Sequence, residues 1–198
     1  MQSATWLIQD TWLLLPKPTP VDPYKEQSID PEVLSAYEWA RKNGITSMQT
    51  AYWARLYDSI TRAELAKMMS VFATKVMGRI IISNPMCDVT KYSDYNSMDV
   101  EQQFYITQAC NLGIMWWSNA TNSLLPYFNP KGLVNRAQFG TVLSRFLYGQ
   151  MYNGDASAER YVKHLQALNK DGIMKIISEP SYRELRGYVM IMMQRIGK

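Results

Sequence analysis

The sequence is poor in the residues on which metal and catalytic chemistry depend. Its 198 residues include one histidine, His164, and two cysteines. One histidine gives no support to the usual zinc ligand sets, which combine several histidines and cysteines. No nucleophile lies in a phrase with a nearby base, and His164 lacks the sequence context of a catalytic partner. We therefore expect a protein that is not an enzyme and that holds no metal and no cofactor.

Long apolar runs are also lacking. The apolar segment "ATWLIQDTWLLL" (4–15) is interrupted by Asp10 and is shorter than the roughly 20 residues of a membrane-spanning helix. No basic stretch precedes it, although a signal peptide would have one. The proline-rich "LPKPTPVDPY" (15–24) follows and is typical of an extended connector. We expect residues 1–24 to be the lead and connector of a larger polypeptide, without a membrane span.

Short phrases recur along the rest of the chain. "SITRAELAKMMSVF" (59–72) and "LVNRAQFGTVLSRF" (133–146) agree in chemistry when Arg62 is aligned with Arg136. A second phrase occurs three times, as "AYEWARKNGI" (36–45), "YITQACNLGI" (105–114) and "HLQALNKDGI" (164–173). Apolar residues four and seven positions before each glycine share one face of a helix, and the Gly-Ile pair is typical of a helix end. Each copy is therefore predicted to be a helix, a stop, a loop and a second helix.

Capping patterns predict where the second helices begin. Thr61 with Glu64, and Asn135 with Gln138, form capping boxes in which the two side chains satisfy each other's backbone donors. These four residues are fully explained by a structural role. They fix the first turn of a helix in each of the first two copies.

The third copy allows two alignments. One places Arg183 on Arg136, and the other treats Ser181 and Glu184 as a capping box equivalent to that at Thr61. In either case the sequence predicts an all-α fold of six principal helices in three pairs. The second helices are expected to begin near Thr61, Asn135 and Ser181.

The arginine after each cap calls for a separate explanation. A cation at the first position of a helix faces the positive end of the helix dipole, which costs about 0.3–1 kcal/mol when the residue is exposed. An anion should therefore lie beside Arg62 and Arg136. One alternative is an internal ion pair with a loop aspartate. The other is an acidic ligand group held by the guanidinium and the free N–H groups together.

These phrases resemble the S-layer homology domain, whose repeats anchor bacterial surface proteins to cell-wall polysaccharide. The resemblance lies in "NGI … SITRAELAKMM", "LGIM … YFNPKGLVNRAQFGTVL" and, more weakly, "DGIM … SYRELRGYVMIMMQR". The middle copy is the fullest, since "KYSDYNS" (91–97) and Phe128-Asn129-Pro130 also match the family pattern. The first copy lacks the Phe-x-Pro, and the loop of the third copy is short.

The resemblance implies a domain over residues 25–198, with repeats at about 25–78, 88–150 and 151–198. It implies a pseudo-threefold bundle with prong loops and ligand grooves between adjacent repeats. The implied function is non-catalytic anchoring at the bacterial cell surface, in the cell wall, through acidic polysaccharide of the pyruvylated type. The implied localisation is extracellular.

The candidate ligand-binding residues follow from the resemblance and from the chemistry of sugar rings. The arginines would meet the acidic group, Asp94 would either pair with Arg136 or accept a hydrogen bond from a sugar hydroxyl, and aromatic side chains would stack on the ring. These residues are Arg62, Arg136, Arg183, Asp94, Trp116, Trp117, Trp53 and Tyr52.

The two cysteines leave two alternatives open. Cys87 and Cys110 are predicted to form a disulfide, and the alternative is two buried free thiols.

A repeat scaffold that contacts other surface-layer subunits without binding sugar competes with the anchoring function. A nucleic-acid partner is not expected: the pI is about 9.0 and the net charge +4, but the basic residues are scattered rather than gathered on one helix.

Overall fold

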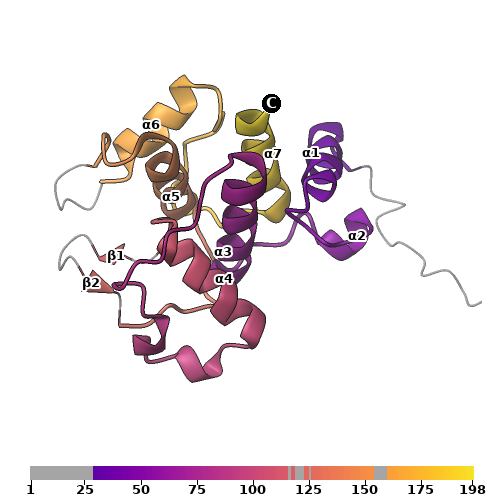
Figure 1. The fold of residues 1–198 in the computed structure, drawn as a ribbon. Helices are drawn as coiled ribbons and strands as arrows, with labels where there is room; N and C mark the ends of the chain where they lie inside the picture. Colours follow the sequence, from indigo (N-terminus) through magenta and orange to yellow (C-terminus); the bar gives the residue numbers. More distant parts are fainter. Residues whose placement is uncertain (1–28, 116, 119–122, 125, 154–159) are drawn as a thin grey trace, which may run out of the picture.

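The computed structural model describes residues 29–115, 117–118, 123–124, 126–153 and 160–198 (Figure 1). These residues form a predominantly helical fold, as predicted. The α-helices are α1 (Pro31–Lys42), α2 (Ala51–Ala54), α3 (Arg62–Val71), α4 (Val100–Asn111), α5 (Arg136–Tyr148), α6 (Val162–Lys170) and α7 (Arg186–Gly197). A π-helical turn (Phe72–Val76) extends α3, and two 3₁₀ turns (Val89–Lys91 and Tyr95–Ser97) precede α4. Strands β1 (Trp117–Ser118) and β2 (Ser123–Leu124) form a small antiparallel pair.

The predicted Gly-Ile helix ends are confirmed. The glycines that follow α1, α4 and α6 have φ values of +69°, +70° and +71°, in the left-handed region that glycine adopts without steric cost. The amide of the isoleucine after each glycine donates to a carbonyl in the last turn of its helix, as in a Schellman end. The glycines are Gly44, Gly113 and Gly172.

Two of the three predicted helix starts are also confirmed. Thr61 caps α3 and Asn135 caps α5, each in a complete capping box. The prediction that the last helix begins near Ser181 is wrong, because α7 begins at Arg186 after the N-cap position Leu185. Residues 180–182 instead form a turn, and residues 183–185 pair with the segments around Ser59 and Asn135. A helix over those residues would leave these contacts unmade.

The three segments just before α3, α5 and α7 meet in a closed ring of backbone hydrogen bonds. The Ile60 amide donates to the Glu184 carbonyl (2.9 Å), the Val134 amide to the Ile60 carbonyl (3.0 Å), and the Glu184 amide to the Val134 carbonyl (2.9 Å). Ile60, Val134 and Glu184 thus occupy matching positions. Two residues further on stand Arg62, Arg136 and Arg186, so the ring places Arg186, and not Arg183, at the position that matches the other two arginines.

The helices pack in three pairs, α1 with α7, α3 with α4, and α5 with α6 (Figure 1). In each pair the helix that follows the ring lies against a helix from a different sequence copy. The core runs continuously through the pairs, and its largest fully buried side chains include Phe72, Phe128 and Phe139. The three helix pairs therefore join the segments in which the repeated phrases occur.

The predicted disulfide between Cys87 and Cys110 is present. It ties the segment after the π-helical turn to the last turn of α4, and both cysteines are buried. Of the helices described, none is long and apolar enough to cross a membrane.

Candidate ligand-binding site

The three matching arginines begin their helices in the same way. The amide of Arg62 donates to the Gly132 carbonyl (2.9 Å), that of Arg136 to Tyr182 (2.9 Å), and that of Arg186 to Asp58 (3.1 Å). The next amide in each helix also donates to a loop carbonyl. These helix N-termini are therefore occupied by the protein's own backbone. The expectation that free N–H groups help to bind an anion is wrong, which leaves only the guanidinium groups as donors.

Arg136 is used inside the protein. Its side chain is 7% exposed, and its Nη1 donates to the Ser178 carbonyl (2.5 Å). The guanidinium lies over the Tyr182 ring at 4.9 Å, and Nε lies 3.7 Å from Oε2 of Glu184. Of the two alternatives for this arginine, the geometry favours the internal ion pair, but the partner is Glu184 and not Asp94.

Glu184 was not expected in this role, because the sequence pattern favoured it as a capping residue. It is 1% exposed and occupies the ring position at which the other copies have Ile60 and Val134. The 3.7 Å separation from Arg136 is an ion-pair distance, too long for a hydrogen bond. Within the described part of the chain, neither carboxylate oxygen has a hydrogen-bond partner. Burial raises the pKa of Glu184, and Arg136 opposes that rise only in part.

Arg186 and Arg183 differ in their surroundings. Arg186 is buried, and its Nη2 contacts Oε1 of Glu64 at 2.5 Å while its Nη1 lies 3.9 Å from Asp58. Arg183 is exposed and donates from Nη1 to the Leu133 carbonyl (3.1 Å). The arginine predicted as the third ligand group therefore lies outside the position shared by the other two, since the ring shifts the alignment by three residues.

Arg62 differs from Arg136 and Arg186 in having no carboxylate of the described residues beside it. Its Nε donates to the Phe128 carbonyl (2.6 Å), and the guanidinium lies over the Phe128 ring at 4.8 Å. Among the described residues no carboxylate lies within ion-pair distance of Arg62, and neither terminal nitrogen has a hydrogen-bond partner. Burial lowers the pKa of Arg62, whereas the Asp94 carboxylate favours its charged form. A partly buried cation with free donors is a suitable receptor for an anionic group.

The loop beside Arg62 is shaped by Asp94. One carboxylate oxygen of Asp94 accepts from the Phe128 amide (2.9 Å) and the other from the Asn129 amide (2.7 Å). Asn129 has a φ of +58°, in the left-handed region that asparagine tolerates better than most residues. Asp94 thus holds the Phe-Asn-Pro turn against Arg62. This positioning role replaces the expected ion pair with Arg136.

Two tyrosines complete the surroundings of Arg62. The Tyr92 ring packs edge-on against Phe128, and its buried hydroxyl has no hydrogen-bond partner among the described residues. Burial raises the pKa of Tyr92 to about 12, so the hydroxyl stays neutral and can donate. Tyr127 is exposed on the same loop. The site therefore combines the Arg62 cation with the exposed aromatic ring of Tyr127, beside the turn that Asp94 holds.

The remaining aromatic candidates divide between two places. Trp53 and Tyr52 lie on α2, in the loop that continues to Asp58 and so to Arg186. Trp116 lies outside the described residues, as does the side chain of Trp117.

The described residues contain no group of three or more histidine, cysteine, aspartate or glutamate side chains placed to hold a metal ion. No known family model and no curated protein matches this chain. Function is therefore inferred from the sequence pattern and the geometry of the site.

Proposed function

We propose that the protein is a non-catalytic cell-surface anchoring module, similar to the S-layer homology domain, that binds acidic cell-wall polysaccharide. In this proposal, three helix–loop–helix repeats surround a pseudo-threefold axis that passes through the backbone ring at Ile60, Val134 and Glu184. The cyclic order of the hydrogen bonds and the three matching arginines support it. The binding site is the one at Arg62.

The observation that carries the proposal is the difference between the three arginines. Arg136 and Arg186 each lie within ion-pair distance of a carboxylate of the protein itself. Arg62 occupies the matching position, but it makes one hydrogen bond to a carbonyl and keeps its terminal donors available. A guanidinium binds a carboxylate through paired N–H groups, and such charge-assisted bonds are roughly twice as strong as neutral ones.

The disulfide supports an extracellular location. Disulfides form and persist in oxidising compartments and are rare in the cytosol. The bridge between Cys87 and Cys110 lies at the start of the segment that carries Tyr92 and Asp94. The bridge therefore anchors that segment, whose Asp94 holds the turn at Phe128 through two hydrogen bonds.

The test is the binding of purified acidic wall polysaccharide to the intact chain and to Arg62→Ala. Losing charge-assisted hydrogen bonds worth about 1.5–3 kcal/mol should weaken binding by roughly one to two decades. Arg183→Ala is the matched control, because it removes an equal charge from an exposed arginine that contacts only a carbonyl. Its affinity should stay close to that of the unmodified protein. A folded Arg62→Ala protein with undiminished binding would contradict the proposed site.

A second candidate function is a repeat scaffold that assembles with other surface-layer subunits without binding sugar. The internal use of Arg136 and Arg186 favours it, since those positions offer little to a ligand. The same binding measurement separates the two functions. Failure of the unmodified protein to bind the polysaccharide, together with concentration-dependent self-association, would support the scaffold.

A further inference from the structure

The chain between the π-helical turn and α4 exposes two isoleucines close together. Ile80 is 83% exposed and Ile82 is 73% exposed, whereas Ile81 between them is half-buried. Single large apolar side chains on a surface are ordinary, but two of them within three residues form a local apolar surface. Residues 79–84, which carry them, are called the isoleucine loop below.

Contacts at both ends hold the isoleucine loop in place. At its start, the Arg79 amide donates to the Ala73 carbonyl (2.8 Å) in the π-helical turn. At its end, the Asn84 amide donates to Oδ1 of Asn111 (2.9 Å), three residues before the disulfide at Cys87. The exposed isoleucines are therefore presented by anchored backbone and not by a free chain end.

Cations lie beside the isoleucine loop. Arg79 begins it, with the guanidinium over the Phe146 ring at 5.5 Å. Lys75 precedes it, and its amine lies over Gly44, 3.1 Å from the place where a Cβ atom of that residue would stand. Because Gly44 closes the end of α1, Lys42 in the last turn of α1 lies at the same end of the fold.

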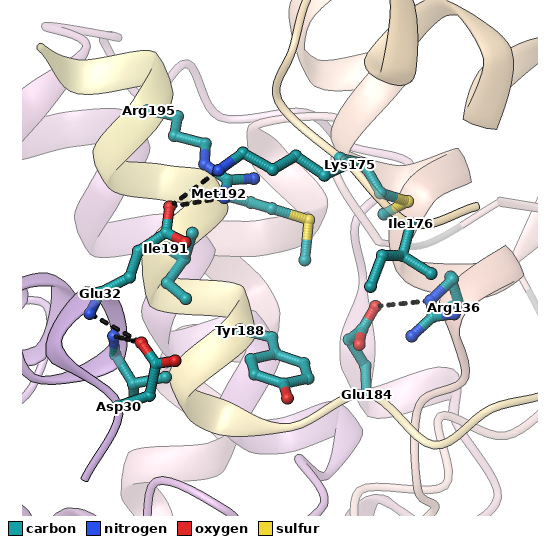
Figure 2. A pocket seen from close by; sticks show the side chains of 12 residues that line it. Asp30, Glu32, Arg136, Lys175, Ile176, Glu184, Tyr188, Ile191, Met192 and Arg195 are labelled. Carbon is teal, nitrogen blue, oxygen red and sulfur yellow. Dashed lines mark hydrogen bonds and ion pairs between the residues drawn. The ribbon is translucent and has the colours of Figure 1, made fainter. Parts of the chain in front are cut away.

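The protein does not neutralise these three cations. Within the described residues, none of them has a carboxylate at ion-pair distance. The chain from residue 65 to residue 87 contains no acidic residue at all. Lys175 and Arg195 differ, because both contact Oε1 of Glu32 (Figure 2). The positive charge beside the isoleucine loop is therefore available to an anionic partner.

The size and the charge of this surface favour a lipid bilayer over a protein as that partner. A stable protein–protein interface buries about 800 Å² on each partner, over roughly 20–30 residues. The apolar part here is one short loop. A second copy docked on the same face would also bring like charges together, which opposes binding. A bilayer is subject to neither limit, because apolar side chains enter its interface while lysine and arginine meet anionic headgroups.

We propose that the isoleucine loop is a membrane-contact surface, in which Ile80 and Ile82 insert into the interface of a bilayer while Lys75 and Arg79 bind its anionic phospholipid headgroups. Through this surface the protein lies on a membrane without spanning it. The loop follows the end of α3, whereas Arg62 begins that helix. The inference goes beyond the proposed anchoring function and does not rest on it.

The test is flotation of the intact protein with vesicles of phosphatidylcholine alone, or of equal parts of phosphatidylcholine and phosphatidylglycerol. The protein should bind the mixed vesicles more tightly, and added salt should weaken this binding because exposed charges are screened. Ile80→Ser/Ile82→Ser should weaken binding by roughly tenfold or more, because two apolar side chains no longer leave water. Lys75→Ala should weaken binding to the mixed vesicles by about fivefold.

A matched pair of double variants controls for general effects of charge and apolar area. Ile176 is 63% exposed and follows a lysine, but that lysine is paired with Glu32. Lys175→Ala/Ile176→Ser therefore loses the same two kinds of side chain as Lys75→Ala/Ile80→Ser, and only the latter should lose vesicle binding. All four positions are exposed, so both variants should keep the Tm of the unmodified protein.

Arg62→Ala separates this inference from the proposed function, because it should reduce polysaccharide binding and leave vesicle binding unchanged. Three results would overturn the inference. They are no binding of the unmodified protein to the mixed vesicles, equal losses in the two double variants, and self-association without vesicles that the isoleucine changes abolish. The last result would identify a second copy of the chain as the partner of the loop. None of these results bears on Arg62.

Discussion

Replacing Arg136 with alanine should destabilise the protein through Glu184. The guanidinium is the cation that lies 3.7 Å from this buried carboxylate, and it also donates to the Ser178 carbonyl. Removing one partner of a buried ion pair leaves the other charge uncompensated, which typically costs about 3–5 kcal/mol. In a domain of this size each kcal/mol lowers Tm by about 2–4 °C, so a fall of roughly 10 °C is expected near neutral pH.

The pH dependence identifies the cause of the loss. Burial raises the pKa of Glu184 above its ordinary value of 4.5, and without Arg136 the pKa rises further. The folded state of Arg136→Ala therefore binds a proton at a higher pH than the unfolded state does. As the pH falls from neutral toward 4.5, protonation neutralises the buried carboxylate, and the deficit relative to the unmodified protein should shrink.

The assay is thermal unfolding at several pH values, together with a second variant. The double change Arg136→Ala/Glu184→Val removes both charges and should recover most of the lost stability, because an apolar pair avoids the desolvation cost. Arg183→Ala is again the control for loss of one positive charge, and its Tm should hardly change. The reasoning is refuted if the deficit of Arg136→Ala is the same at neutral and acidic pH, or if the double variant is no more stable than the single one.

The remaining predictions concern the core. Burial lowers the pKa of His164 to about 4, so as the pH falls the unfolded state binds a proton before the folded state does. The free energy of unfolding should therefore fall by up to roughly 3 kcal/mol between pH 6.5 and 4. Chemical unfolding of His164→Leu should not show this fall. Gly140→Ala should destabilise by about 1–3 kcal/mol in the same assay, because the added methyl group would overlap the Leu165 side chain. Changing Cys87 and Cys110 to alanine should cost roughly 3 kcal/mol, measured against the oxidised protein; equal stability would show that the bridge is dispensable.

The sequence contained enough information to predict the helices and their ends. Gly44, Gly113 and Gly172 end their helices, and the capping boxes at Thr61 and Asn135 begin theirs, as the spacing of those residues predicted. These features depend on contacts within a few residues along the chain, so short patterns are sufficient to recognise them. The disulfide was also predictable, because the chain has only one possible pair of cysteines.

The start of α7 was not predictable in the same way. Ser181 and Glu184 have the spacing of a capping box, and nothing near them in sequence argues against a helix there. The ring of hydrogen bonds decides the matter, since it pairs Glu184 with Ile60 and Val134, which are far away along the chain. Long-range backbone pairing overrides local propensity because an unpaired buried amide or carbonyl costs more than a lost cap contributes.

The sequence by itself determined that an arginine would begin each of two helices and that something anionic would lie near it. Only the tertiary structure decided which anion that would be. Arg136 meets the buried carboxylate of Glu184, Arg186 meets Glu64, and Arg62 meets a carbonyl and an aromatic ring. The three arginines begin their helices with the same backbone pairing, but each lies against residues from elsewhere in the chain, and the charges of those residues decide whether the guanidinium has a carboxylate beside it.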